Sequence, residues 1–243
     1  MIELSHLSKR YGDTHAVEDI TLSVGRGQLY GFIGPNGAGK TTTIRMIGGL
    51  LAPTAGQIII DGIDMADDPV SAKARIGLIP DRPFLYEKLT GMEFLRFTAD
   101  LYDVSGNGFY ERAQELLTLF SLQHRSEELV EAYSHGMKQR LIMAAALLHE
   151  PRLLIVDEPM VGLDPRGIKM VRELFRSLAA EGMTIFMSTH TLSLAEDVCD
   201  HIGIIHQGRL IADGPIASVK RTIAGDPASL EHVFLEATGA PEP

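Results

Sequence analysis

Residues 34–42 read Gly-Pro-Asn-Gly-Ala-Gly-Lys-Thr-Thr, and this stretch decides the fold. Its pattern, G-x-x-x-x-G-K-[ST], predicts a loop whose backbone N–H groups wrap a triphosphate, because glycine tolerates the backbone angles that such a loop needs. The lysine adds a mobile positive charge for the outer phosphates, and the threonine after it offers a hydroxyl to Mg²⁺. The sequence therefore predicts a nucleoside triphosphate site formed by Gly34, Pro35, Asn36, Gly37, Ala38, Gly39, Lys40, Thr41 and Thr42.

The residues on either side of the loop favour this interpretation over an ordinary glycine-rich turn. Residues 29–33 form an apolar run typical of a buried strand, and residues 41–47 have the pattern of a helix. The loop then places its anion at the N-terminus of a helix, where unpaired N–H groups and the helix dipole favour negative charge.

Composition limits the other interpretations. The 243 residues, 45% of them hydrophobic, are enough for one large domain or for a core with a smaller lobe. A net charge of −10, from 22 basic and 32 acidic residues, opposes direct binding to nucleic acid or to an anionic membrane surface. Cys199 is the single cysteine, so no internal disulfide forms and a reducing compartment is expected. No signal peptide is recognised at the start, and no apolar run approaches the roughly 20 residues that cross a bilayer, so we expect a soluble chain.

The pattern of apolar residues predicts an α/β architecture with an insertion. Period-2 alternation within residues 1–30 predicts antiparallel strands, whereas residues 84–150 read as successive helices, one of them opened by a capping box at Thr90 and Glu93. After Pro151, strands and helices alternate, which predicts a parallel sheet covered by helices. We expect one P-loop NTPase domain over residues 1–243. Its core comprises residues 1–83, with an antiparallel N-terminal lobe, and residues 151–243; its inserted helical subdomain comprises residues 84–150. The expected elements after Pro151 are strands at 153–156, 184–187 and 202–205 and helices at 168–180 and 192–198.

Two adjacent carboxylates follow the apolar strand at residues 153–156. Asp157 and Glu158 lie where open α/β sheets bind their ligands, at the carboxyl end of a strand. Neighbouring strand residues point in different directions, so the two acids can have different roles. We expect Asp157 to hold Mg²⁺, through a bound water, and Glu158 to act as the general base that activates the attacking water. The alternative is an exposed Asp-Glu-Pro turn after a buried strand.

With further motifs in the expected order, the chain resembles the ATP-binding cassette (ABC) ATPases, the nucleotide-hydrolysing subunits of ABC transporters. The resemblance covers nearly the whole length. It comprises the loop at 34–42 (Walker A), Tyr-Ser-His-Gly-Met-Lys-Gln-Arg at 133–140 (the family signature), Asp157 and Glu158 (Walker B), Gly-Leu-Asp-Pro at 162–165 (the D-loop) and His190 (the switch histidine).

The resemblance implies roles for residues outside the loop. Ser134 itself fits the N-cap of a helix that runs toward Leu148. The resemblance implies that Ser134 and Gly136 would contact the γ-phosphate of a nucleotide bound by a second subunit. Asp164 would organise that shared interface, and His190 would donate a hydrogen bond to the γ-phosphate and the catalytic water.

The resemblance also implies an adenine site. Tyr11 would stack on the adenine ring, and Val17 would provide an apolar contact beside it. No Asn-Lys-x-Asp guanine-reading motif occurs, so ATP is the expected nucleotide and Mg²⁺ the expected ion.

The sequence departs from the family pattern in three places. Asp81 follows Ile79-Pro80 where the family has Gln; we expect a water-bridged contact to Mg²⁺, with a purely structural turn at 80–83 as the alternative. His135 and Met137 stand where Gly and Gln are usual, and residues 160–161 are apolar where a small polar pair is common. Ser134, Gly136 and Glu158 remain, so nucleotide contact is expected to survive.

The leading hypothesis is an ATPase subunit that drives transport through separately encoded membrane permease subunits. A groove between residues 81–90 and the helical insert would receive a short permease helix, and the tail at 229–239 resembles that of ATPases paired with export-type permeases. The chain would then be cytoplasmic and peripheral on the inner face of the cell membrane, and it would dimerise with a second copy or with a paralogous cassette.

Two competing hypotheses are less favoured. A soluble ABC ATPase of DNA repair or translation usually carries a long coiled coil or two cassettes, whereas only 117 residues separate Lys40 from Asp157 (157 − 40 = 117), and no nucleic-acid partner is expected from the charge. A nucleotide-sensing subunit without turnover would be expected to lack Glu158 or His190, and both are present.

Overall fold

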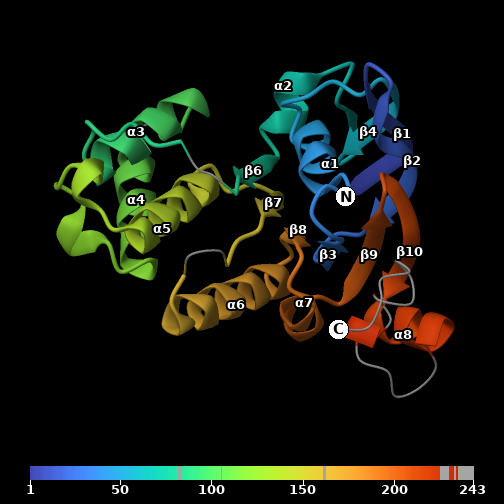
Figure 1. The fold of residues 1–243 in the computed structure, drawn as a ribbon. Helices are drawn as coiled ribbons and strands as arrows, with labels where there is room; N and C mark the ends of the chain where they lie inside the picture. The colour runs from blue at the N-terminus through green and yellow to red at the C-terminus, as the bar shows by residue number, and fades with distance from the viewer. Residues whose placement is uncertain (82–83, 105, 161–162, 225–229, 233, 235–243) are drawn as a thin grey trace.

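The computed structural model describes residues 1–81, 84–104, 106–160, 163–224, 230–232 and 234. Figure 1 shows a helical lobe, made by α3 (Gly91–Leu101), α4 (Asn107–Leu119) and α5 (His135–Leu147), standing beside a core that contains the strands and the N-terminus. The connections between the two parts run through β6 and β7, as the figure shows.

The N-terminal lobe is a four-stranded antiparallel sheet, of which the period-2 alternation within residues 1–30 predicted the first two strands. Its strand order is β2-β1-β4-β5. Along β1, Ile2 and Leu4 are buried while the residues between them are exposed, which is the pattern of a sheet with one face on the core. The strands are β1 (Ile2–Tyr11), β2 (Thr14–Val24), β4 (Ala55–Ile60) and β5 (Ile63–Asp64).

The central sheet has six strands in the order β10-β9-β3-β8-β7-β6. The pairs among β9, β3, β8, β7 and β6 are parallel, as predicted, but β10 pairs antiparallel with β9 at the edge. The reason is the two-residue turn Gln207-Gly208, in which both residues have positive φ, the geometry of a tight hairpin. The strands are β3 (Leu29–Ile33), β6 (Ile76–Ile79), β7 (Leu153–Asp157), β8 (Thr184–Thr189), β9 (His201–His206) and β10 (Arg209–Pro215).

Helices cover both faces of this sheet, so its strands are apolar on both sides. Ile185 and Met187 of β8 belong to the same core cluster as the apolar residues of α6 and α7, whereas Phe186 packs in the cluster that contains α1. This explains why the strand reads as a continuous apolar run. The core helices are α1 (Lys40–Ile47), α2 (Pro69–Lys73), α6 (Pro165–Ala180), α7 (Leu192–Val198) and α8 (Ile216–Ala224).

The helical lobe consists of α3 (Gly91–Leu101), α4 (Asn107–Leu119) and α5 (His135–Leu147). The capping box is confirmed: Thr90 Oγ1 accepts from the N–H of Glu93 at 3.1 Å, and the Glu93 carboxylate accepts from the N–H of Thr90 at 2.8 Å. α4 ends at Leu119, just before the chain turns through a positive φ at Ser121. Its apolar face packs against α5 in a cluster that continues into the core.

Candidate nucleotide-binding and catalytic site

The loop at residues 34–39 joins β3 to α1 and requires glycine. A Cβ on Gly34 would lie 2.4 Å from the carbonyl oxygen of Ile205, and one on Gly39 would lie 2.6 Å from that of Ala16. Gly39 also has a φ of 111°, a backbone conformation that residues with a side chain rarely adopt. Gly37 has a φ of 79° but faces open space. The loop is therefore held closely by the core on one side and left open on the other.

The first turn of α1 begins at Lys40, and no described side chain caps it. A helix start leaves backbone N–H groups without partners inside the helix, and these N–H groups attract anions. Both the loop and the helix start therefore fit a phosphate chain, as the sequence predicted.

The Lys40 side chain links the loop to the acidic strand end. Although it carries an ammonium group, it is only 7% exposed. Its Nζ donates to the carbonyl oxygens of Gly34 at 2.7 Å and Pro35 at 3.2 Å, and it lies 3.8 Å from Glu158 Oε1. Burial lowers the pKa of this ammonium, although the Glu158 and Asp157 carboxylates act in the opposite direction. The positive charge thus lies between the phosphate loop and the two acids.

Asp157 and Glu158 have different surroundings, as expected of two acids with different roles. Asp157 is the last residue of β7 and is buried, whereas the Glu158 side chain is 14% exposed. Glu158 has a φ of 53°, a conformation that is uncommon outside glycine and that is found at functional sites. This turn directs Glu158 away from the strand and toward the loop residues.

His190 lies next to Glu158 because of the strand order. β8 lies between β3, which leads into the loop, and β7, which ends in the acids, and His190 follows β8 directly. Its Nδ1 is 2.9 Å from Glu158 Oε1. An ionised carboxylate only accepts hydrogen bonds, so Nδ1 is the donor. The structure therefore brings Lys40, Glu158 and His190 together.

A residue that the sequence did not reveal joins this group. Ser188 of β8 is buried, and its Oγ donates to Asp157 Oδ1 at 2.5 Å. The two residues are partners in the register of β7 and β8. This pairing is not visible in one sequence, because it depends on which strands become neighbours.

The residues expected at a magnesium ion lie at the same edge. Thr41 is exposed in the first turn of α1, and Asp81 is exposed two residues after β6, the strand beside β7. Within the described ranges, no group of three or more His, Cys, Asp or Glu is placed to hold a metal ion. These few oxygen ligands fit Mg²⁺, which keeps several waters and binds substrate phosphates rather than an all-protein cage. The alternative interpretation of Asp81 is a purely structural turn at 80–83. Residues 82–83 of that turn lie outside the described residues.

The signature residues lie at the start of α5, in the helical lobe. Ser134 is the N-cap of α5, as predicted, and its Oγ accepts from the N–H of Met137 at 3.3 Å. Asp164 caps α6 in the same way, accepting from the N–H of Gly167 at 2.8 Å. Ser134, Gly136 and Asp164 line one cleft of about 600 Å³. None of the described residues that line this cleft belongs to the phosphate loop or to α1. Gly162 of the D-loop motif lies outside the described residues.

The expected adenine residues lie at the N-terminal lobe. Tyr11 ends β1 with about half of its surface exposed, and the Lys9 ammonium lies 5.3 Å from its ring centroid. Val17 is buried in β2, close enough to the loop that a Cβ on Gly39 would lie 3.4 Å from it. The stacking on adenine stays a prediction.

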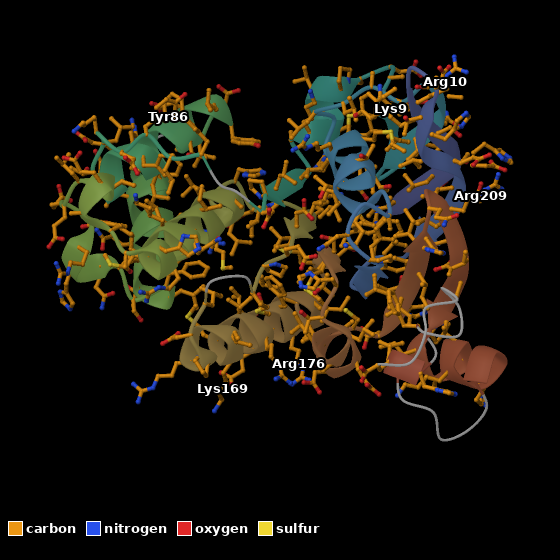
Figure 2. All side chains as sticks on the ribbon, in the orientation of Figure 1. Lys9, Arg10, Tyr86, Lys169, Arg176 and Arg209 are labelled. Atoms are coloured by element: carbon orange, nitrogen blue, oxygen red, sulfur yellow. The ribbon has the colours of Figure 1, made fainter. Side chains whose placement is uncertain are left out.

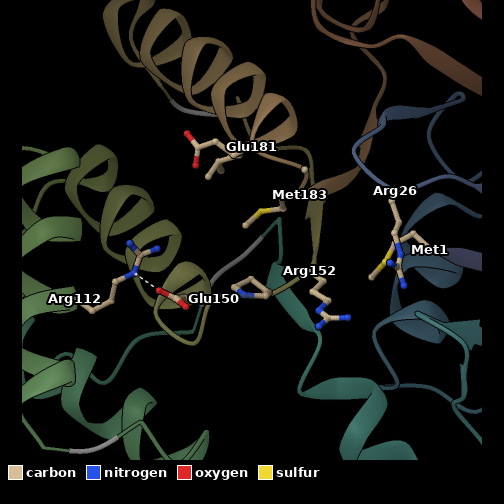
Figure 3. Close-up of a pocket in the computed structure, with 10 residues that line it drawn as sticks. Met1, Arg26, Arg112, Glu150, Arg152, Glu181 and Met183 are labelled. Carbon is tan, nitrogen blue, oxygen red and sulfur yellow. Dashed lines mark ion pairs between the residues drawn. The ribbon is translucent and has the colours of Figure 1, made fainter.

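A cleft of about 540 Å³, lined by both charged and apolar residues, lies at the opposite end of the central sheet (Figure 3). Arg152 and Met183, which line it, directly precede β7 and β8 and are therefore far along the strands from Asp157. Arg26 and Arg152 both pair with the buried Asp61 carboxylate, at 2.6 and 2.7 Å. Because these guanidinium groups already have an anionic partner, this cleft is a structural junction rather than a second phosphate site.

A glycine-rich loop between a strand and a helix, with an acidic strand end beside it, defines the class of P-loop nucleoside triphosphatases. Comparisons with known proteins refine the class. Residues 17–161 match the family model described as "ABC transporter". The chain is 45% identical over 222 residues to the bacitracin transport ATP-binding protein BcrA of Bacillus licheniformis, covering 91% of this chain and 72% of that protein. It is 38% identical to the linearmycin resistance ATP-binding protein LnrL of Bacillus subtilis, covering 93% and 73%.

Solved structures agree. The fold matches one titled "Structure of ATP binding subunit of ABC transporter" with a TM-score of 0.92 and 39% identity, covering 98% of this chain and 99% of that one. It matches the dimeric cassette MJ0796 with a TM-score of 0.82 and 26% identity, covering 89% and 99%. The chain belongs to the ABC transporter family and has the fold of its ATP-hydrolysing, ATP-binding subunits. None of the helices in the described parts of the chain is long and apolar enough to cross a lipid bilayer.

Proposed function

We propose that this chain hydrolyses ATP at the edge where Glu158 meets the phosphate loop, with Glu158 as general base. The single observation that carries the proposal is the convergence on Glu158 Oε1, which lies 2.9 Å from His190 Nδ1 and 3.8 Å from Lys40 Nζ. A partly exposed carboxylate beside a phosphate loop can accept a proton from water, and such a base typically contributes about 10²–10⁴ in rate.

The other residues of the site would bind the nucleotide and magnesium and orient the reacting groups. The loop N–H groups and Lys40 would hold the phosphates, His190 would orient the carboxylate and contact the γ-phosphate, and Tyr11 with Val17 would hold adenine. Thr41 and Asp157 would hold magnesium, with Asp81 acting through a water. When bound, that ion would offset negative charge on the phosphate oxygens.

The second half of the site is proposed to come from another subunit. A Cβ on Gly136 would meet no atom within 4 Å, so nothing in the described part of the chain requires glycine there. A ligand or partner that approaches the start of α5 closely would require it. The dimeric form of a related cassette supports this arrangement. A second copy of this chain needs no further assumption, and a paralogous cassette remains the alternative partner.

Export through separate permease chains is the proposed biological role. The names of relatives support it, since they include a bacitracin transport protein, a linearmycin resistance protein and a daunorubicin resistance protein from Streptomyces coeruleorubidus. The chain would then lie on the inner face of the cell membrane, attached to its permease.

An aromatic patch made by Phe84, Tyr86 and Phe97 supports the permease contact. The rings touch edge to face, with centroids 5.4 and 5.1 Å apart, yet Phe84 is 78% exposed. Figure 2 shows Tyr86 projecting from the helical lobe. Adjoining exposed aromatic rings are typical of a surface that a partner covers. The tail at 229–239, which also suggested export, lies largely outside the described residues.

The deciding experiment replaces Glu158 by Gln. We expect Glu158→Gln to lower the turnover of ATP by about 100-fold or more, while ATP affinity stays within about twofold and an ATP-loaded dimer accumulates on size-exclusion chromatography. Glu173→Gln is the matched control, because Glu173 is an exposed carboxylate of α6 that pairs only loosely with Lys169, at 3.8 Å. Turnover by Glu158→Gln within about threefold of wild type would refute the assignment of the base.

A further inference from the structure

Ser188 contacts both Asp157 and Glu158, although no sequence motif pointed to this residue. Its Oγ donates to Asp157 Oδ1 at 2.5 Å and lies 3.3 Å from the backbone nitrogen of Glu158. The same Glu158 N–H also points to the carbonyl oxygen of Ser188, at 3.2 Å. Ser188 thus contacts the side chain of one acid and the backbone of the other.

The chemistry of these groups fixes the direction of both hydrogen bonds. The Glu158 N–H can only donate, and an ionised Asp157 carboxylate can only accept. A hydroxyl has one proton to donate and lone pairs to accept with, so Ser188 must accept from Glu158 and donate to Asp157. Because Ser188 is fully buried, water does not compete for its hydroxyl.

Both contacts are made where the backbone adopts an uncommon conformation. The peptide between Asp157 and Glu158 leads from a regular strand into the positive φ of Glu158. Such a conformation persists only where the surroundings hold it. Losing the Ser188 hydroxyl would leave a buried Asp157 oxygen without this donor and would leave the Glu158 N–H with the Ser188 carbonyl alone.

We propose that Ser188 is a positioning residue: through one hydroxyl it fixes the Asp157 carboxylate for the metal ion and holds the backbone turn that presents Glu158. This proposal rests on the proposed function. It predicts that Ser188 affects metal binding and turnover but not the affinity for nucleotide in the absence of metal.

The test compares Ser188→Ala with Ser188→Cys, which fills the same space with a weak donor, and with Ser188→Thr, which restores the hydroxyl. Mn²⁺ binding, measured by electron paramagnetic resonance in the presence of a non-hydrolysable ATP analogue, provides a readout that does not depend on turnover. We expect Ala and Cys to weaken Mn²⁺ binding by about three- to tenfold and to lower kcat by about tenfold, the range that corresponds to the net contribution of a typical hydrogen bond. ATP affinity in EDTA should stay within about twofold, and Thr should recover most of both losses.

Thr184→Val is the matched control. Thr184 is a buried hydroxyl at the other end of β8, where Oγ1 accepts from the N–H of Gly27 at 3.0 Å and donates to the carbonyl oxygen of Gly25 at 3.2 Å. Its removal should lower the melting temperature without changing Mn²⁺ binding. Unchanged Mn²⁺ binding in Ser188→Ala, or an equal loss in Thr184→Val, would overturn the proposal. Failure of the proposed function would look different, because Glu158→Gln would then retain turnover.

Discussion

The helix starts of this molecule are built in two different ways. The first turn of α1 has no described side-chain cap, whereas α5 and α6 are capped by their own Ser134 and Asp164 side chains. At α1 the surrounding side chains converge, with Lys40 reaching across to Glu158. At α5 the neighbouring glycine faces empty space.

The difference shows what each region needs in order to function. The α1 region has its charges, its glycines and its carboxylates supplied by one chain, so it is organised before any ligand arrives. The α5 region is a capped helix with an open glycine, and under the proposed function its serine and glycine would face a second subunit. The first region is expected to depend on its own electrostatics and the second on the approach of another molecule.

The largest loss of function is expected from a substitution in the α1 region. Lys40→Ala removes the only cationic side chain that the described structure places between the loop and Glu158. Hydrogen bonds to charged groups contribute about 1.5–3 kcal/mol, so the affinity for ATP should fall by about 10–100-fold in calorimetric titrations. Lys73→Ala, an exposed lysine of α2, is the control. Unchanged affinity in Lys40→Ala would remove the basis for the phosphate site.

A smaller effect, of a different kind, is expected from the α5 region. Gly136→Gln should leave folding stability unchanged or slightly higher, because glycine is the poorer helix former and a Cβ meets no atom within 4 Å. Turnover should fall by about tenfold, which corresponds to 1.4 kcal/mol, while ATP binding to the monomer is retained.

Gly108→Ala provides the control for this change, since Gly108 is a helical glycine of α4 with equally open surroundings. Equal turnover in Gly136→Gln and wild type would show that no partner approaches α5 closely.

The two regions also differ in how far the sequence could predict them. The loop at 34–39 is local, so its glycines, its lysine and the following helix were readable from one stretch. The capping roles of Ser134 and Thr90 were readable for the same reason, and both are confirmed. Local hydrogen bonds leave a local pattern.

The contacts between strands were not readable in this way. Ser188 meets Asp157 across 31 positions of sequence, and His190 meets Glu158 across 32. His190 was found only through the resemblance to a family, and Ser188 was missed. The antiparallel β10 was missed as well, although Gln207-Gly208 was a local turn signal for it.

Ser134 allows capping to be separated from contact with a nucleotide. Aspartate caps helices as well as serine does, so Ser134→Asp should keep the melting temperature of wild type, whereas Ser134→Ala should cost about 1 kcal/mol of stability. Both changes should lower turnover, because Ala lacks the hydroxyl and the Asp carboxylate repels a phosphate. Full turnover in Ser134→Asp would mean that Ser134 is a cap and nothing more.

The smallest effect is expected at Asp81, which lies at the edge of the α1 region. Because Asp81 would act through a water and not bind the ion directly, Asp81→Ala should raise the Mg²⁺ concentration needed for half-maximal turnover by only about two- to threefold, less than 1 kcal/mol. The strand order supports this, since β6 lies beside β7 and places Asp81 near the end of the strand that carries Asp157. Asp67→Ala, an exposed aspartate before α2, is the control. Identical Mg²⁺ curves for Asp81→Ala and wild type would support the other interpretation, in which Asp81 only fixes the turn after Pro80.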